Sequence, residues 1–557
     1  MLDLSSLLST SRDVSAVPVL DEAAFRLGTY RDGSVLKFRG VVRDVQDPEL
    51  VLLGDEAPAL TVGDAVRQQL VERVPLTVTL FPHVSDWSTR AFRDVSVVDK
   101  SIQSDGRCSV SERPLTSKRS SVAMDEQTND VCGQDQDESH VKKSKAVVQQ
   151  QQGEEALLVP QAVNIYVYDG QYEDTPLDAF KVNEAFEFVG ILDLMVPGTA
   201  TKKDDTETVL SAKQLEELQI SDCIDEVQRT GRSGVVLHCC RANSLQSVHH
   251  VRPHESREFY EQIHESNDSR TKFCRDEWSK LGQEADIAAV RLQIVQYLAQ
   301  TVRGDTLAAE YLLLGLLSHV YSRADPSTPL GNLSINLALD NASGSVTEGA
   351  QLDQVYAHKD YEREMLLSGV LQVANGTTML VNETVLSAGQ LNDQGVKNIA
   401  ALQSLVDKML LPYDFHFYNM DFPQDVAVVT VSEGKSILPV TVAVPVVADS
   451  NVTEELPEEQ VLECFRLFLC VLRSFVVTIG NEEAEMAEKH YVECRKSEQK
   501  VALEDLHRWL RLARLVALSR GEGQISKDSW DAMLALETHR LARLPATTPG
   551  LHELPGD

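Results

Sequence analysis

The chain has 557 residues, more than a single hydrophobic core supports, so we expect two or three domains. Its 85 acidic residues outnumber its 52 basic ones, which gives a formal net charge of −33. Nucleic-acid binding depends on clustered Lys and Arg that displace counterions, so this balance disfavours a DNA- or RNA-binding protein. No run of residues is apolar over the length that a bilayer requires. The nine scattered cysteines predict reduced thiols rather than a disulfide framework.

Short strands are predicted in the first half of the chain. Strand-like alternation occurs at Val35–Val42, Leu50–Leu53, Pro75–Phe81, Asn164–Tyr168, Ala185–Leu192 and Gly234–His238. Gly40 and Gly190 stand where a small barrel would bend. We therefore expect an N-terminal segment at 1–29 and then an OB-like β-barrel built from two parts, 30–100 and 156–255.

Residues 101–155 are rich in Ser, Asp, Gln and Lys and contain almost no aromatic residue. Such a composition cannot bury enough apolar surface to offset its ordering entropy, so it predicts a disordered polar insertion in a barrel loop. Two basic clusters lie within this tract and have the spacing of a bipartite nuclear signal. They are Lys118 with Arg119, and Lys142 and Lys143 with Lys145. The alternative is simple solvated charge.

After a linker at 256–285, the pattern predicts an α/β module at 286–450. Helices are expected at Ile287–Val302 and Leu307–Arg323, and buried parallel strands at Leu333–Leu339, Met379–Val381 and Val426–Val431. Residues 451–557 form a predicted helical C-terminal region. Its helices are expected at Leu462–Ile479, Glu482–Glu498, Ala502–Arg520 and Lys527–Leu544. The fold class is therefore α+β and multidomain.

Several runs of residues resemble the mini-chromosome maintenance (MCM) complex-binding protein family. They are Lys37–Asp44 with Asp47–Glu49, Gly304–Leu313, Asn375–Thr377, Tyr413–Phe415, Ser432–Ser436, Glu504–His507 and the segment around Trp530. The resemblance implies a nuclear, non-catalytic protein that binds subunits of the replicative MCM helicase. It also implies a role in assembling, holding or unloading MCM complexes during DNA replication, and in sister chromatid cohesion. Chromatin association would then be indirect, with no cofactor, metal, membrane or direct nucleic-acid binding.

The chain also resembles a degenerate MCM subunit, with an OB-type barrel followed by an AAA+-like module and a helical C-terminal lid. In that comparison, helix Tyr311–Arg323 and strand Leu333–Leu339 lead toward a phosphate loop. The segment Leu371–Glu383 corresponds to the acidic strand that helps to hold Mg²⁺. The resemblance thus implies where a nucleotide site would lie.

The residues at those positions do not suit a triphosphate. A phosphate loop needs glycines, a Lys for the β and γ phosphates, and a Ser or Thr on Mg²⁺. Here the strand is followed by a segment with Asp340, Ser343 and Gly344 but no Gly-Lys-Ser/Thr. The acidic strand ends in Asn382–Glu383 rather than Asp-Glu, which removes one charge from the metal site. We therefore expect a pseudo-ATPase that works through protein surfaces.

Three other features have competing interpretations. The run Gly434–Ser436 has the tail of a phosphate loop but follows a strand without the full motif, so we expect a strand-ending turn. His238, Cys239, Cys240, His249, His250 and His254 invite a zinc reading. Adjacent cysteines on a strand point to opposite faces, which disfavours that reading. The aromatics Phe38, Tyr166, Tyr168, Phe186 and Phe188 are the candidates for stacking on bases.

Two rival functions follow from these features. The first is an active AAA+ ATPase in which Lys435 or another lysine reaches phosphate. The second is an OB-type single-stranded nucleic-acid binder that uses the barrel aromatics. The acidic residues around Phe186 and Phe188, including Glu184 and Glu187, disfavour the second because they would repel a phosphate backbone.

Overall fold

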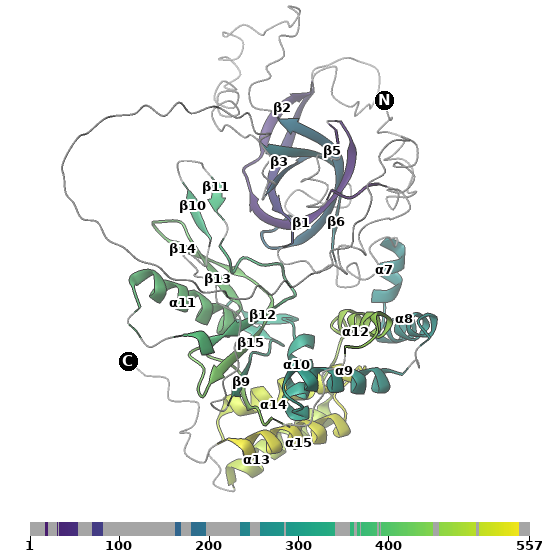
Figure 1. The fold of residues 1–557 in the computed structure, drawn as a ribbon, viewed down its shortest axis with the longest axis vertical. Coiled ribbons are helices and arrows are strands. Elements are labelled where there is room, and N and C mark those ends of the chain that lie inside the picture. Colours follow the sequence, from purple (N-terminus) through teal and green to yellow (C-terminus); the bar gives the residue numbers. More distant parts are fainter. Residues whose placement is uncertain are drawn as a thin grey trace, which may run out of the picture. The chain divides into compact units, whose positions relative to one another are not determined.

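The computed structural model describes most of the chain outside the polar insertion at 101–155 (Figure 1). The described residues are 17–20, 30–31, 33–53, 69–81, 162–168, 180–195, 234–245, 257–282, 286–339, 357–360, 365–367, 369–386, 389, 391–448, 456–496 and 501–544. The expected N-terminal segment lies largely outside these ranges. The tract 101–155 and the basic residues Lys118, Arg119, Lys142, Lys143 and Lys145 lie wholly outside them.

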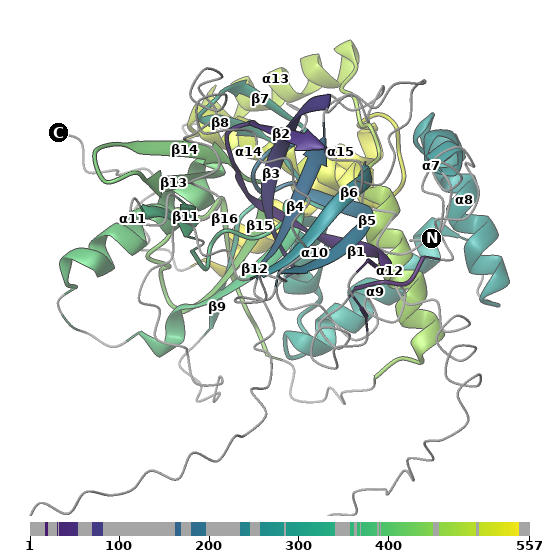
Figure 2. The same cartoon turned by 90° about the horizontal axis from the view of Figure 1, so that it is seen from above.

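Six strands in the first half form one sheet, and five of them form the predicted barrel. They are β1 (Val35–Val45), β2 (Glu49–Leu53), β3 (Gln69–Thr79), β4 (Val163–Tyr168), β5 (Ala185–Met195) and β6 (Gly234–Ser244). The strand order is β1-β5-β6-β4-β3-β2, and β1 also pairs with β3. Five strands therefore close into a barrel (Figure 2). Strand β2 pairs with Gln69–Arg73 of β3, and β1 pairs with Leu76–Thr79 further along the same strand. All pairs are antiparallel except β4 with β6.

The alternation in sequence places one set of side chains inside the barrel. Phe38, Phe186 and Phe188 are buried there among the aliphatic residues of β3 and β4. Phe186 and Phe188 lie with their ring centroids 5.8 Å apart. On β1 and β5, Arg39 donates from Nε to the buried Glu187 carboxylate at 2.6 Å, so that acid is paired inside the protein rather than exposed.

Gly190 allows two barrel strands to approach closely. The register between β5 and β6 shifts between Val189 and Gly190. A Cβ at Gly190 would overlap the main-chain oxygen of His238 and lie 2.9 Å from Cγ of Leu237. The sequence prediction of a bend at this glycine is consistent with that shift, because only a residue without a side chain fits.

We expect Gly190→Ala to destabilise the barrel by about 1–3 kcal/mol, because the added methyl group forces the two strands apart. Urea unfolding followed by circular dichroism measures the change. The matched control is Gly389→Ala, since a Cβ at Gly389 meets nothing within 4 Å. Equal unfolding midpoints for the two variants would contradict the close-packing explanation.

The α/β module contains a parallel four-stranded sheet. Its strands are β9 (Ile335–Leu339), β12 (Thr377–Asn382), β15 (Val426–Glu433) and β16 (Val442–Pro445), in the order β12-β15-β9-β16. One face packs on α9 (Ile287–Thr301) and α10 (Thr306–Leu317). The other face packs on α11 (Asp393–Lys408) through Val406. The sheet is therefore a layer between helices, as the fully apolar strands predict.

Smaller elements surround this sheet. The hairpin β7 (Ser322–Asp325) and β8 (Thr328–Leu330) follows α10. A second sheet has the order β11-β10-β13-β14, with β10 at His358–Asp360, β11 at Met365–Leu367, β13 at Leu410–Asp414 and β14 at Asn419–Pro423. The 3₁₀ helix η4 (Glu383–Val385) follows β12 directly.

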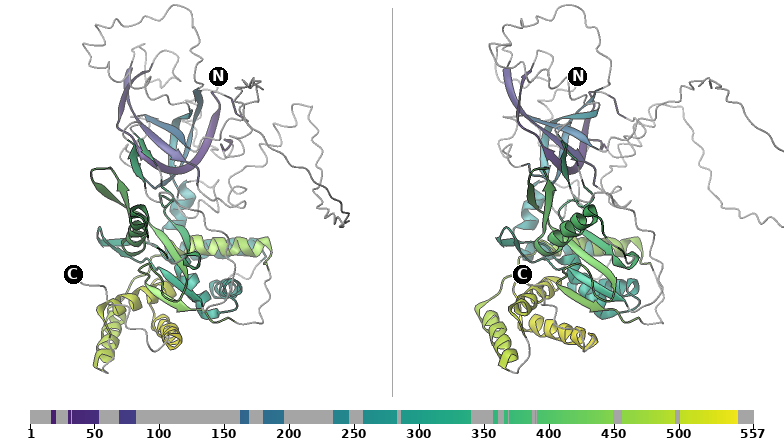
Figure 3. Two further views of the ribbon diagram at one scale, coloured as in Figure 1. Left: turned by 60° about the vertical axis from the view of Figure 1, so that its left-hand side comes forward. Right: turned by 90° about the vertical axis from the view of Figure 1, so that its left-hand side faces the viewer.

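The C-terminal region is helical, as predicted. It comprises α12 (Glu459–Leu472), α13 (Asn481–Lys496), α14 (Leu503–Ser519) and α15 (Lys527–Arg543). Figure 3 shows these helices in yellow-green and yellow. Their buried residues, among them Phe468, Leu515 and Trp530, belong to the same hydrophobic cluster as Tyr311 of α10 and Ile335 of β9. These helices therefore share one core with the sheet.

Four secondary-structure predictions need correction. The range 256–285, predicted to be a linker, contains α7 (Arg257–His264) and α8 (Asn267–Lys280), and Trp278 of α8 is buried in the main core. The helix predicted to reach Arg323 ends at Leu317, because residues 322–330 pair as a hairpin. The helix predicted to reach Ile479 ends at Leu472. The β-branched residues after it favour extended backbone, and Thr478 makes a β-bridge with Gln524.

The fourth correction concerns β12. It was predicted to be a buried strand, but it lies at the edge of the sheet and its Leu380 side chain is exposed. A short apolar run does not reveal which strand of a sheet is at the edge. None of the helices in the described ranges combines the length and apolarity needed to cross a membrane.

Candidate functional site

The ends of β9, β15 and β12 meet at one edge of the sheet, because the three strands are parallel. This carboxyl edge is where ligands bind in open α/β sheets. Asp340, Ser343 and Gly344, which follow β9, lie outside the described residues. Asn382 is the last residue of β12 and Glu383 is the first residue of η4. One strand, β15, separates β12 from β9.

Asn382 and Glu383 both make local structural bonds. The Asn382 side-chain oxygen accepts from the Thr384 main-chain N–H at 3.1 Å and from its hydroxyl at 2.8 Å. The Glu383 carboxylate accepts from the Ser436 hydroxyl at 2.7 Å and from the Ile437 main-chain N–H at 3.0 Å. Glu383 is only 8% exposed. Both of its oxygens are therefore used to join the end of β12 to the loop after β15.

The run Gly434–Ser436 forms the predicted turn. Strand β15 ends at Glu433, and Gly434 has a φ of +89°, which favours glycine. The sequence prediction missed that Ser436 in this turn binds Glu383. Two residues from separate degenerate motifs thus bind each other, and long-range contact of this kind has no signal in the spacing of either motif.

The zinc reading finds no support in the described part of the chain. Cys239 is buried inside the barrel, and Cys240 is on the other face of β6, as its alternation predicts. Burial raises the pKa of the Cys240 thiol to about 11, so this side chain stays protonated. Within the described ranges no three His, Cys, Asp or Glu side chains gather as a metal site. His249, His250 and His254 lie outside those ranges.

The barrel aromatics are buried in the described structure. Phe38, Phe186 and Phe188 form the inner core, as the alternation predicts. Tyr166 and Tyr168 project from the opposite face of β4 and are also buried. The Tyr168 hydroxyl bonds to Nδ1 of His238 at 2.7 Å. None of these five rings is exposed as a stacking surface for a base.

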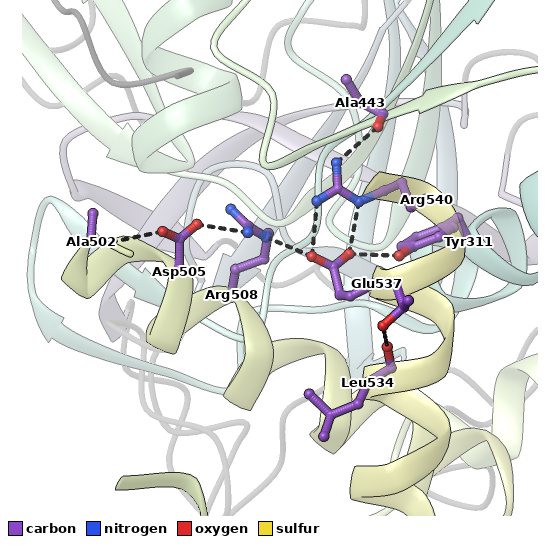
Figure 4. Close-up of polar contacts among 9 residues, drawn as sticks. Tyr311, Ala443, Ala502, Asp505, Arg508, Leu534, Glu537 and Arg540 are labelled. Atoms are coloured by element: carbon purple, nitrogen blue, oxygen red, sulfur yellow. Dashed lines mark hydrogen bonds and ion pairs between the residues drawn. The ribbon is translucent and has the colours of Figure 1, made fainter. Parts of the chain in front are cut away.

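A buried ionic network joins the C-terminal helices to the α/β module (Figure 4). Glu537 of α15 accepts from the Tyr311 hydroxyl of α10 at 2.6 Å and from Nε of Arg540 at 2.8 Å. It also accepts from Nη2 of Arg540 at 2.9 Å and from Nε of Arg508 on α14 at 3.2 Å. Burial alone would raise the pKa of Glu537, but the bonds and charges of Arg540 and Arg508 hold this pKa below its ordinary value.

The network extends at both ends. Arg540 donates from Nη1 to the main-chain oxygen of Ala443 on β16 at 3.2 Å. Arg508 pairs with Asp505 at 2.7 Å, and Asp505 accepts the main-chain N–H of Ala502 at the start of α14 at 2.8 Å. Three helices and one strand therefore meet at the Glu537 carboxylate and its partners (Figure 4).

A family model described as mini-chromosome maintenance replisome factor matches residues 57–358 and 351–544. The chain belongs to this family. The mini-chromosome maintenance complex-binding proteins of Bos taurus and Homo sapiens are each 30% identical to it over 408 residues. Each alignment covers 67% of this chain and 60% of the relative, so the chain spans about three-fifths of their length. The Drosophila melanogaster protein of that description is 25% identical over 613 residues, covering 97% of this chain and 94% of the relative.

The residues that first indicated the MCM-binding family include structural anchors. Within Gly304–Leu313, Asp305 caps α10 by accepting the main-chain N–H groups of Leu307 at 3.0 Å and Ala308 at 3.2 Å. Its second oxygen accepts from Nη1 of Arg543 on α15 at 2.5 Å and from the main-chain N–H of Val447 at 2.9 Å. Burial alone would raise the pKa of Asp305, but Arg543 and these N–H groups hold this pKa below its ordinary value.

A second family run leads into an exposed aromatic hairpin. Tyr413 and Asp414 end β13, and Phe415 follows it. Phe415 and Tyr418 stack with ring centroids 5.2 Å apart across the turn to β14. At the tip, Phe417 is 85% exposed, and Tyr418 and Met420 are also exposed. We name this surface, Phe417 with Tyr418 and Met420, the hairpin tip. The aromatic-rich sequence Phe415–Tyr418 was a signal for the hairpin tip that the prediction of strands did not use.

Proposed function

We propose that this chain is a non-catalytic binding protein of MCM helicase subunits. The observation that carries the proposal is the family match, which extends over nearly the whole chain from residue 57 to residue 544. Its relatives in Bos taurus, Homo sapiens and Drosophila melanogaster are described as mini-chromosome maintenance complex-binding proteins. The chain would act in the nucleus on the assembly, holding or unloading of MCM complexes during DNA replication, and in sister chromatid cohesion. Its association with chromatin would be indirect.

The mechanism that we propose is mimicry of an MCM subunit. The barrel followed by a parallel sheet with helices on both faces supports an AAA+-like architecture. The strand-end chemistry supports a pseudo-ATPase, because both oxygens of Glu383 are bonded to Ser436 and Ile437. A buried carboxylate that already accepts a bond at each oxygen has less capacity to orient a catalytic water. Such a chain would occupy a subunit interface without supplying catalytic groups.

The hairpin tip is the MCM-contacting surface that we propose to test. Exposed apolar groups at the end of a rigid hairpin are costly in water and are typical of interaction sites. The turn is preorganised, because the His416 main-chain N–H bonds to Asp414 at 2.7 Å and the Phe417 main-chain N–H to the Phe415 oxygen at 2.7 Å. A preorganised aromatic anchor loses little entropy when it is buried by a partner.

We expect the purified full-length chain to co-purify MCM subunits, and Phe417→Ala to weaken that binding roughly thirtyfold or more, as for an aromatic hot spot. A titration of the chain against the isolated MCM subunits measures the change. Leu456→Ala is the control, since Leu456 is 87% exposed but is not part of the hairpin tip. Failure of the wild-type chain to retain MCM subunits would refute the function, whereas equal binding by both variants would refute only the surface.

The two rival functions predict different measurements. An active ATPase would turn over ATP, and Glu383→Gln or Lys435→Ala would abolish the turnover. A single-strand binder would hold an oligonucleotide with an affinity that falls steeply as salt rises. The buried barrel rings and the net charge of −33 disfavour the second rival. The bonded state of Glu383 disfavours the first.

A further inference from the structure

Arg514 of α14 is a buried cation for which the described structure supplies no counter-ion. Its side chain is only 8% exposed, and its Nε and Nη1 atoms are enclosed without a hydrogen-bond partner in the described part of the chain. The guanidinium lies over the ring of Tyr321, whose centroid is 4.0 Å from Cζ. Buried arginines in proteins are almost always paired with an acid or an acceptor.

The neighbouring charges do not compensate Arg514. Arg473 donates to the main-chain oxygens of Gly376 at 2.8 Å and Ser318 at 3.3 Å, and it lies 3.9 Å from Asp425. Asp425 also accepts the Val320 main-chain N–H at 3.0 Å. Asp425 is thus already engaged, and Asp407, a second acid near this cluster, acts on Arg511 rather than on Arg514. Arg514 therefore adds a positive charge that neither acid pairs with in the described structure.

Two further groups stand next to Arg514. Arg511 is one helical turn earlier on α14, and its Nη1 reaches the Thr441 hydroxyl at 3.4 Å. The His319 ring is 6.4 Å from the ring of Tyr321. Burial and then the charges of Arg514 and Arg473 lower the pKa of His319, so its imidazole is neutral at pH 7. Burial also lowers the pKa of Arg511 and of Arg514.

We propose that Arg514, with Arg511 and His319 beside it, binds an oxyanion, and that Tyr321 covers the guanidinium when the site is empty. The ligand is a phosphate or carboxylate group, because the planar guanidinium fork matches both. Such a ligand would complete the two unpartnered N–H groups and neutralise the excess charge. Tyr321 is 52% exposed, at the start of the β7–β8 hairpin, so its ring can turn away from Arg514 without opening the core.

The backbone holds Tyr321 in place as a cover. Gly331 has a φ of +103°, and a Cβ there would lie 2.5 Å from Cδ1 of Tyr321 and 2.5 Å from the His319 oxygen. The Tyr321 main-chain N–H bonds to the Leu330 oxygen at 3.1 Å. The ring therefore rests over Arg514 because residue 331 lacks a side chain. The site is at the opposite end of the sheet from Glu383, since Thr441 directly precedes β16.

The test is the thermal unfolding of the full chain in chloride buffer with added sodium sulfate or sodium acetate, which represent tetrahedral and planar oxyanions. We expect a saturable rise in melting temperature for the wild-type chain. Arg514→Met should weaken the apparent affinity roughly tenfold to a hundredfold, the loss of one or two charge-assisted hydrogen bonds. Saturation by sulfate alone would assign a phosphate group, and saturation by acetate as well would assign a carboxylate.

Two more variants test whether the saturable rise in melting temperature comes from anion binding at Arg514. Arg495→Met removes an exposed arginine that also lies over a tyrosine, 5.8 Å from the Tyr491 ring, and should keep the saturable rise. Tyr321→Ala should strengthen anion binding, because it removes the cover. Sulfate stabilises many proteins by exclusion from their surface, but that effect does not saturate at millimolar concentration. The same unsaturable response in the wild-type chain and Arg514→Met would overturn the site.

Discussion

Replacing Glu537 by Gln is expected to destabilise the folded chain by about 3–5 kcal/mol, the cost of removing one partner from a buried ion pair. The carboxylate is 3% exposed and neutralises Arg540 and Arg508 together. The amide would leave the Arg540 guanidinium with uncompensated charge in the core, whereas Arg508 would keep its ion pair with Asp505. Denaturant unfolding measures the loss. Glu459→Gln serves as the control, because Glu459 pairs with Arg466 at the surface, where such pairs contribute about 0–1 kcal/mol.

Glu537 also makes the stability of the folded chain depend on pH in the acidic range. The pKa of Glu537 in the folded chain is below its ordinary value of 4.5. When the pKa of a carboxyl group is lower in the folded chain than in the unfolded chain, its charge stabilises the fold at a pH above the unfolded-state pKa. This stabilisation is lost as the pH falls toward the pKa in the folded chain. Wild-type stability should therefore fall below about pH 4.5, and Glu537→Gln should show a flatter curve in that range. Parallel curves for the two proteins would contradict a charged role for Glu537.

Asp305→Ala is expected to cause the second large loss of stability. It removes the ion pair with Arg543 and the cap of α10, and the cap contributes about 1 kcal/mol. The Arg543 side chain is 27% exposed, so the loss from the ion pair should lie below the roughly 3–5 kcal/mol that breaking a fully buried pair costs. Asp305→Asn should recover the cap but not the ion pair, because asparagine caps helices as well as aspartate does. Calorimetric melting of the three proteins separates the two contributions.

The control for this series is Asp286→Ala. Asp286 caps α9 through a 3.4 Å contact with the Ala288 main-chain N–H, and it has no ion pair in the described structure. We expect a loss of about 1 kcal/mol or less there. If Asp305→Ala proved no more costly than Asp286→Ala, the bond from Asp305 to Arg543 would not hold α15 against the module.

Local patterns in the sequence predicted much of the fold because each pattern is decided by near neighbours. The alternation around Phe186 and Phe188 placed both rings on the core face, and the apolar β-branched run at Val426–Val431 predicted a buried parallel strand. The edge position of β12 and the helices at 257–280 were missed. Burial of Trp278 and exposure of Leu380 depend on which distant elements pack beside them.

The candidate sites depended still more on distant contacts. The resemblance to an MCM subunit singled out Asn382 and Glu383, but the bond from Ser436 to Glu383 joins residues that spacing rules treat separately. The excess charge at Arg514 was invisible for the same reason, because Tyr321, Arg473 and Arg514 come from three separate elements. A sequence pattern reports which side chains are present, whereas compensation of a buried charge depends on what packs around it.

Two paired strands of the barrel, β3 and β4, are joined by a long stretch of chain. Thr77 pairs with Asn164, although β3 ends at Thr79 and β4 begins only at Val163. The entropy lost on closing such a connection grows with the logarithm of its length, by about 0.6 kcal/mol for each doubling. Long insertions between these two strands are therefore tolerated thermodynamically. Their effect falls on the rate of folding, because strands that must find distant partners pair slowly.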